Sequence, residues 1–192
     1  MVHARVIGDQ TLTLLVSGKL WRNSLVMQDL ETGTLWSHIT GEALEGELAG
    51  AHLEILPSVQ TTWAEWRAAN PDGLVLVKSD EVKSSRYASY FEDPDRTGLF
   101  RARWLQGRLP GKSLIYGLRD GPHAVAVVPE ILADGQTRVV DIGGREAIIQ
   151  LQKDGGVRAW WQGAGLQHED LAVLQTFWFA WSGFYPNTTV VD

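Results

Sequence analysis

The sequence predicts an α+β fold that is mainly β and is built from two similar β-rich units. At least nine short runs of β-favouring apolar residues are separated by glycine-containing turns. Only two segments carry helix signals, which limits the helical share of the fold. A pair of tryptophans three residues apart, followed by a proline, occurs twice at an offset of 115 residues. The repeat predicts that each unit ends in a short tryptophan-bearing helix.

The first unit is predicted to contain short strands followed by one helix. Gly33 supplies a hairpin turn and Pro57 stops a later strand. Thr62 and Glu65 form an S/T-x-x-E capping box, which predicts a helix near residues 62–70 that ends before Pro71. The β runs are residues 11–16, 24–28, 34–36, 53–56 and 74–77.

The second unit is predicted to follow a long polar connection that contains Pro94, Pro110 and one strand near residues 99–104. A second helix is predicted near residues 176–184. The β runs of this unit are residues 113–118, 123–128, 137–140, 145–151 and 157–161. The predicted organisation is one compact domain, with a first unit at 1–78, a connecting segment at 79–112 and a second unit at 113–192.

The tryptophans of the repeated motif are predicted to be mostly core residues. Trp63 and Trp66 are three residues apart, as are Trp178 and Trp181, so each pair shares one helix face. Because a two-turn helix is unstable alone, this face must pack on a sheet. Stacking of these indoles on a ligand is the alternative.

Composition and charge exclude several classes of function. The 192 residues include 17 basic and 23 acidic side chains, and the net charge of -6 has the wrong sign for binding nucleic-acid phosphates. The absence of cysteine excludes disulfides, thiolate metal sites and a cysteine nucleophile. The chain has no apolar run near the ~18 residues of a membrane helix and no signal peptide at its start. We therefore expect a soluble, cytoplasmic protein; export with a targeting segment outside this chain is the alternative.

One segment departs from the acidic balance. From Lys83 to Lys112 the chain has seven basic and three acidic residues. Such a segment can bind an anion, although a solvated face that balances acidic neighbours is the alternative. Arg86, Arg101 and Arg103 are the candidates for holding a small anionic ligand, because guanidinium groups make bidentate contacts with carboxylate or phosphate.

A candidate acid–base pair lies at the end of a predicted hairpin strand. A carboxylate at Glu42 would stabilise the imidazolium of His38 and orient its ring. Alternatively, Thr40-Gly41 is a simple turn and His38 caps a carbonyl or faces solvent. The five histidines lack metal-ligand spacing, and no phosphate-loop or dinucleotide motif occurs, so we predict no metal and no cofactor.

A series of short motifs follows in a fixed order along nearly the whole chain. They include Val16-Ser17-Gly18, Asn23-Ser24-Leu25-Val26-Met27, Thr32-Gly33-Thr34-Leu35-Trp36-Ser37, Leu56-Pro57-Ser58, Thr62-Trp63-Ala64-Glu65-Trp66, Arg108-Leu109-Pro110-Gly111-Lys112 and Phe177-Trp178-Phe179-Ala180-Trp181. In this order they resemble the domain-of-unknown-function 3179 family of prokaryotic proteins. The resemblance implies the fold of that family and no settled activity.

Two departures from the family pattern bear on function. Family members usually carry a Tyr-Cys-Pro-x-Cys-type segment upstream of the position matching Met1, so thiol redox or thiolate-metal chemistry does not carry over to this chain. His38 stands where the family more often has glutamine. The family's upstream residues would also add strands to the first unit, so we expect an open edge at strand 11–16 and a homodimer that covers it, or coverage within one chain.

These observations lead to three functional hypotheses. The leading one is a non-catalytic binding or accessory module without a cofactor. The alternative is an enzyme that acts on a small anionic substrate through His38 and Glu42. The third is a structural protein that presents an apolar surface to a protein partner.

Overall fold

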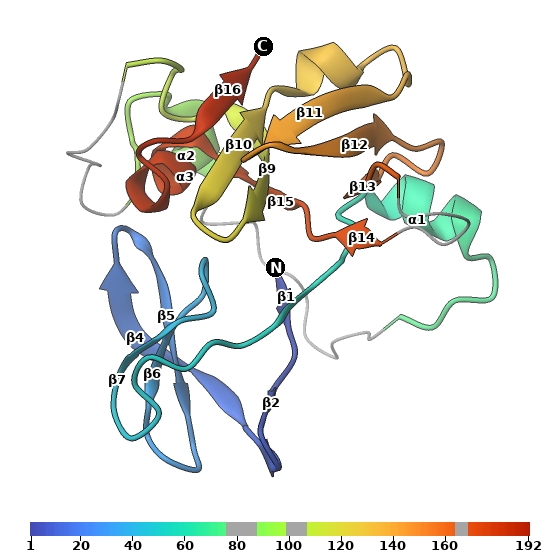
Figure 1. Cartoon of the computed structure of the whole chain (residues 1–192). Coiled ribbons are helices and arrows are strands. Elements are labelled where there is room, and N and C mark those ends of the chain that lie inside the picture. The colour runs from blue at the N-terminus through green and yellow to red at the C-terminus, as the bar shows by residue number, and fades with distance from the viewer. Residues whose placement is uncertain (76–87, 99–106, 164–168) are drawn as a thin grey trace.

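The computed structural model describes residues 1–75, 88–98, 107–163 and 169–192 (Figure 1). Sixteen strands, three α-helices and one 3-10 helix lie in these residues. The predicted class, α+β and mainly β, is confirmed. Within the described ranges, no helix is long and apolar enough to cross a membrane.

The N-terminal part is an antiparallel meander with two short strand pairs beside it. Its elements are β1 (Val2–His3), β2 (Val6–Ile7), β3 (Gln10–Thr11), β4 (Leu14–Trp21), β5 (Ser24–Asp29), β6 (Leu35–Ser37), β7 (Ala43–Glu45), β8 (Ile55–Leu56) and α1 (Trp63–Ala69). Strands β4, β5, β6 and β7 pair in that order, β2 pairs with β3, and β1 pairs with β8. The turn from β4 to β5 places Arg22 and Asn23 at positive φ, as a tight two-residue hairpin requires. A small core around Trp36 and Leu12 holds this part together.

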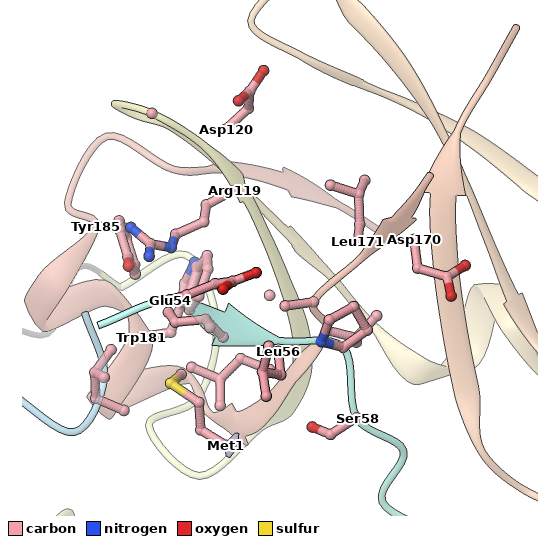
Figure 2. Close-up of a pocket in the computed structure, with 18 residues that line it drawn as sticks. Met1, Glu54, Leu56, Ser58, Arg119, Asp120, Asp170, Leu171, Trp181 and Tyr185 are labelled. Atoms are coloured by element: carbon pink, nitrogen blue, oxygen red, sulfur yellow. The ribbon is translucent and has the colours of Figure 1, made fainter. Parts of the chain in front are cut away.

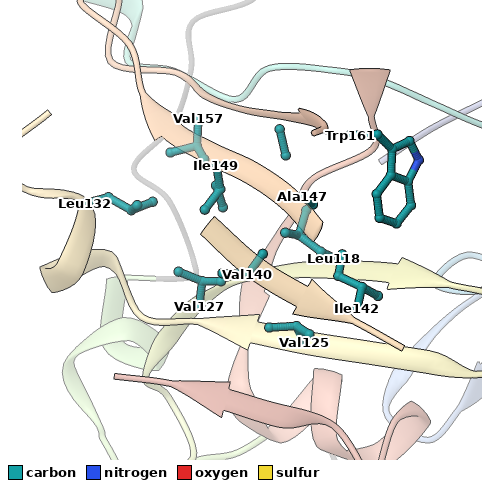
Figure 3. Packing of buried hydrophobic residues seen from close by; sticks show 11 residues of the cluster. Leu118, Val125, Val127, Leu132, Val140, Ile142, Ala147, Ile149, Val157 and Trp161 are labelled. Carbon is teal, nitrogen blue, oxygen red and sulfur yellow. The ribbon is translucent and has the colours of Figure 1, made fainter. Parts of the chain in front are cut away.

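The C-terminal part contains two four-stranded sheets that pack face to face. Its elements are α2 (Ala88–Glu92), β9 (Leu114–Asp120), β10 (His123–Val127), the 3-10 helix η1 (Pro129–Leu132), β11 (Arg138–Ile142), β12 (Arg145–Leu151), β13 (Val157–Trp161), β14 (Asp170–Leu171), β15 (Leu174–Phe177), α3 (Trp178–Phe184) and β16 (Thr189–Val191). One sheet has the order β15-β9-β10-β16, with β10 and β16 parallel, and the other has the order β11-β12-β13-β14. Figure 3 shows Leu118 and Val125 of the first sheet facing Val140 and Ile142 of the second across the main core.

The two tryptophan-bearing helices have the same local geometry. Each has seven residues, and the C-cap φ and ψ angles are -128° and 68° at Asn70 and -123° and 70° at Tyr185. The capping box of Thr62 and Glu65 is formed as predicted. Residues 74 and 75, whose counterparts 189 and 190 lie in β16, are not in a strand. The duplication of a whole unit therefore stays a prediction.

The prediction that the tryptophans of the repeated motif are mostly core residues holds for Trp178 and Trp181 and is wrong for Trp63. Trp178 and Trp181 are 0% and 1% exposed, because β15 leads directly into α3 and lays the helix on its own sheet. Helix α1 starts seven residues after β8 and buries none of its residues. Trp63 is 56% exposed and stacks on the half-buried Trp66, with 5.3 Å between ring centroids.

Several predicted strand boundaries also differ from the structure. The run at 11–16 is divided between β3 and β4, because Leu12 turns into the core. Two short elements in the C-terminal part, α2 and β14, carry no signal in the sequence. The strand predicted at 99–104 and residues 76–77 of the run at 74–77 lie outside the described residues.

Strand β4 is an edge strand of its sheet. Leu15 and Val16 are exposed on it, and Val16 is 72% exposed. A register shift between Val16 and Leu20, with Gly18 at a φ of 77°, bulges this strand. Bulges blunt strand edges, whereas exposed apolar side chains favour pairing. The homodimer expected at this edge stays a prediction.

Candidate functional site

A cleft of about 360 Å³ lies between the N-terminal and C-terminal parts; we call it the central cleft. Its walls come from residues 54–58 around β8, from the end of β9 and its turn, from residues 170–174 around β14, from Trp181 of α3, and from Tyr185, the C-cap of that helix (Figure 2). The volume is at the small end of the range for small-molecule sites, about 300–1,000 Å³. The cleft therefore has the size of a site for a small metabolite.

Arg119 is the cationic side chain among the residues that line the central cleft. Side chains alternate along β9, so Arg119 points to the same side as Gly117, against which the Trp181 indole packs. Its Nη2 donates a hydrogen bond to the carbonyl oxygen of Thr40 at 3.3 Å. None of the ion pairs found within the described ranges includes Arg119. The guanidinium keeps donors for a ligand.

Tyr185 lies beside the Arg119 guanidinium in Figure 2. Burial raises the pKa of the Tyr185 hydroxyl, and the charge and hydrogen bond of Arg119 oppose this rise without cancelling it. The hydroxyl therefore stays protonated at neutral pH. A guanidinium and a neutral hydroxyl side by side form a set of donors suited to an oxyanion.

Three carboxylates line the same cleft, but they have different surroundings. Asp120 accepts a hydrogen bond from Arg145 at 3.0 Å. Asp170 is directed away from the cleft, whereas the carboxylate of Glu54 points into it (Figure 2). Glu54 is exposed, and no ion pair within the described part of the chain includes it. Glu54 is thus the acidic group of the cleft that is available to a ligand.

The Trp181 side of the cleft is held in place by close packing. A Cβ atom built on Gly117 would lie 2.3 Å from the Trp181 ring, so only glycine admits the indole here. The indole Nε1 donates to Thr188 Oγ1 at 2.9 Å, and the ring packs on Tyr185 with 4.3 Å between centroids. Trp181 and Tyr185 are therefore held in place before any ligand binds.

His38 lies against His3 and directly precedes Ile39, which lines the cleft. His3 Nε2 is 2.9 Å from the carbonyl oxygen of His38, and the two rings meet edge to face at 6.0 Å. Burial is the main cause that lowers the pKa of both histidines. Both rings are therefore neutral at pH 7.

The predicted pairing of His38 with Glu42 has no counterpart in the contacts of the described residues, where no hydrogen bond or ion pair joins the two side chains. The backbone of Glu42 instead bridges to His52, and its carbonyl oxygen accepts from the Ser37 amide at 2.8 Å. Their acid–base role stays a prediction. Arg86, Arg101 and Arg103 lie outside the described residues.

The main residues of the central cleft were not found from the sequence. Arg119 directly precedes the turn at Asp120-Gly121, and this position at a hairpin end is its only local signal. Glu54 and Tyr185 are far from it in the chain, so no motif joins them. Among the residues that the structure describes, no three His, Asp or Glu side chains gather as metal ligands.

The two histidines predict a pH-dependent stability. The pKa of each histidine is lower in the folded chain than in the unfolded chain, so the unfolded chain takes up protons first as the pH falls. The contribution of the two neutral rings to stability is therefore complete above the unfolded pKa of about 6.5 and is lost as the pH falls through the folded pKa. We expect the free energy of unfolding to fall between pH 7 and 5, by at most about 1.4 kcal/mol per pH unit for each histidine.

The measurement is urea unfolding at several pH values for the wild type and the double variant His3→Gln/His38→Gln, which keeps polar side chains but does not titrate. The variant should show a flatter pH profile in this window. Replacing the exposed His52 by glutamine is the matched control. If the free energy of unfolding changed equally with pH in the wild type and the double variant, this would contradict the role given to His3 and His38.

Comparisons with known proteins give one family. A family model described as "Protein of unknown function (DUF3179)" matches residues 1–162. No curated protein and no solved structure matches the chain. The match includes Glu54 and Arg119 but not Trp181 and Tyr185, so the central cleft combines residues inside and outside the matched range.

Proposed function

Because the chain belongs to the DUF3179 family, whose description gives no activity, we propose its function from the central cleft: the protein is a non-catalytic module that binds a small anionic ligand. The single observation behind this proposal is the Arg119 guanidinium. It is half-buried in a preformed cleft, and its hydrogen bond to the Thr40 carbonyl is long.

The chemistry of Arg119 favours a carboxylate or another planar oxyanion. A guanidinium presents five N–H donors in a fixed fork that matches the two oxygens of a carboxylate. Tyr185 adds a hydroxyl donor from a second element. Partial burial removes water that would otherwise compete for these donors, so each hydrogen bond is stronger than at an open surface.

Arg119→Gln is expected to weaken anion binding about tenfold to a hundredfold, because hydrogen bonds to a charged group contribute about 1.5–3 kcal/mol. The measurement is isothermal titration of the purified chain with acetate, 4-methylpentanoate, sulfate and phosphate at constant ionic strength. Thermal unfolding in the same buffers gives a second readout, because a ligand that binds only the folded state raises the melting temperature.

The matched control is Arg67→Gln, which removes the same charge from the exposed surface of α1, outside the cleft. It should bind as the wild type does. Circular dichroism checks that both variants keep the sheet content. Unchanged affinity in Arg119→Gln, or no binding of any of the anions to the wild type, would overturn the proposed function.

A further inference from the structure

We propose that the ligand of the central cleft is a zwitterion, namely a free α-amino acid with an apolar side chain, whose carboxylate binds Arg119 and whose ammonium group binds Glu54. This inference rests on the proposed function and narrows it to one class of ligand. It follows from the two opposite charges and the apolar residues that share the cleft.

The first step is the pair of opposite charges. Arg119 comes from β9 of the C-terminal part, and Glu54 directly precedes β8 of the N-terminal part. Figure 2 shows both side chains at the same cleft, yet they are not joined by any ion pair found in the described ranges. A simple anion on Arg119 would share the cleft with the Glu54 carboxylate, a charge of the same sign that disfavours its binding. A ligand with an ammonium group would turn this repulsion into attraction.

The second step is the choice of Glu54 as the partner of the ammonium group. Asp120 is already bound by Arg145, and Asp170 is directed away from the cleft in Figure 2. Glu54 is exposed, so it keeps acceptor positions for ammonium donors. Arg119 is therefore the cationic side chain of the cleft, and Glu54 is its available carboxylate.

The third step is the apolar part of the wall. Leu56, Leu171 and Leu174 are half-buried and line the cleft together with the buried Ile39. An apolar side chain of the ligand would remove the exposed surface of these residues from water, at about 25 cal/mol per Å². The volume of about 360 Å³ suits one amino acid better than a longer peptide.

The experiment compares three probes of nearly the same shape on the full chain. L-Leucine carries both charges, 4-methylpentanoate lacks the ammonium group, and 3-methylbutylamine lacks the carboxylate. Isothermal titration should give leucine an affinity at least tenfold higher than that of either analogue, because only leucine satisfies both Arg119 and Glu54.

The variant Glu54→Gln tests the ammonium partner. It should lower the affinity for leucine at least tenfold and leave the affinity for 4-methylpentanoate equal or higher, because the carboxylate contact is untouched. Glu47→Gln is the matched control, since Glu47 is exposed and does not line the cleft. Arg119→Gln should lower the affinity for both leucine and 4-methylpentanoate.

The outcomes separate this inference from the proposed function. If 4-methylpentanoate binds as tightly as leucine and Glu54→Gln changes neither affinity, the zwitterion inference is overturned and anion binding stands. If 3-methylbutylamine binds as tightly as leucine, the carboxylate adds nothing and the zwitterion inference is overturned. If leucine and all the anions tested above fail to bind, both proposals fail.

Discussion

Gly117→Ala is expected to lower the free energy of unfolding by about 3 kcal/mol, the upper part of the usual range for overpacking a core. The added Cβ would lie 2.3, 2.5 and 2.6 Å from three carbon atoms of the Trp181 ring. The indole cannot move away freely, because its Nε1 is bound to Thr188 and its ring packs on Tyr185. Urea unfolding followed by tryptophan fluorescence gives the value.

The control for this substitution is Gly107→Ala. Among the described residues, a Cβ at Gly107 meets no atom within 4 Å beyond its chain neighbours, and its φ is not in the left-handed region, so alanine should fit there. This variant should match the wild type or be slightly more stable, since alanine restricts the unfolded chain. Equal stability of Gly117→Ala and Gly107→Ala would show that Trp181 does not pack on the β9 backbone. Because Trp181 also lines the central cleft, Gly117→Ala should reduce ligand affinity as well.

Asp29→Ala is also expected to lower the free energy of unfolding by about 3 kcal/mol. Asp29 is 1% exposed, and its Oδ2 accepts a hydrogen bond from Trp36 Nε1 at 2.7 Å. Its Oδ1 accepts from the Thr32 amide at 2.6 Å and from the Thr32 hydroxyl at 2.9 Å. Alanine would leave the indole N–H of the fully buried Trp36 without this acceptor, and a buried unpaired donor costs about 1–3 kcal/mol.

The contribution of the Asp29 carboxylate to stability depends on pH in the acid range. Burial by itself raises the pKa of Asp29, but the hydrogen bonds from Trp36, Thr32 and Gly33 outweigh it and lower the pKa overall. Its contribution to stability is therefore present above the unfolded pKa of about 3.9 and is lost as pH falls through the folded pKa.

Urea unfolding at pH 7 and pH 3 measures both effects. The difference in the free energy of unfolding between the wild type and Asp29→Ala should be larger at pH 7 than at pH 3. Asp72→Ala, at an exposed position after α1, is the matched control and should change the free energy of unfolding by less than about 0.5 kcal/mol. A difference between Asp29→Ala and the wild type that does not depend on pH would contradict the role of the ionised carboxylate.

Features that depend on residues close together in the chain could be predicted from the sequence. The alternation of apolar residues and the glycine turns predicted a mainly β fold, because both signals act within a few residues. The capping box of Thr62 and Glu65 predicted α1, because its hydrogen bonds join residues three apart. The order of short motifs predicted the family, and the family match over residues 1–162 confirmed it.

Burial of individual side chains and contacts between distant segments could not be predicted in this way, because they depend on the three-dimensional packing. Trp63 and Trp178 have the same local sequence pattern, yet Trp178 is buried because β15 lays α3 on a sheet, whereas α1 buries none of its residues. His38 contacts His3, 35 residues away, through a bond that no local spacing encodes. Arg119 and Glu54 come from different parts of the chain and meet at one cleft. Such contacts depend on how the two parts pack, and packing is set by the whole core and not by any short segment of sequence.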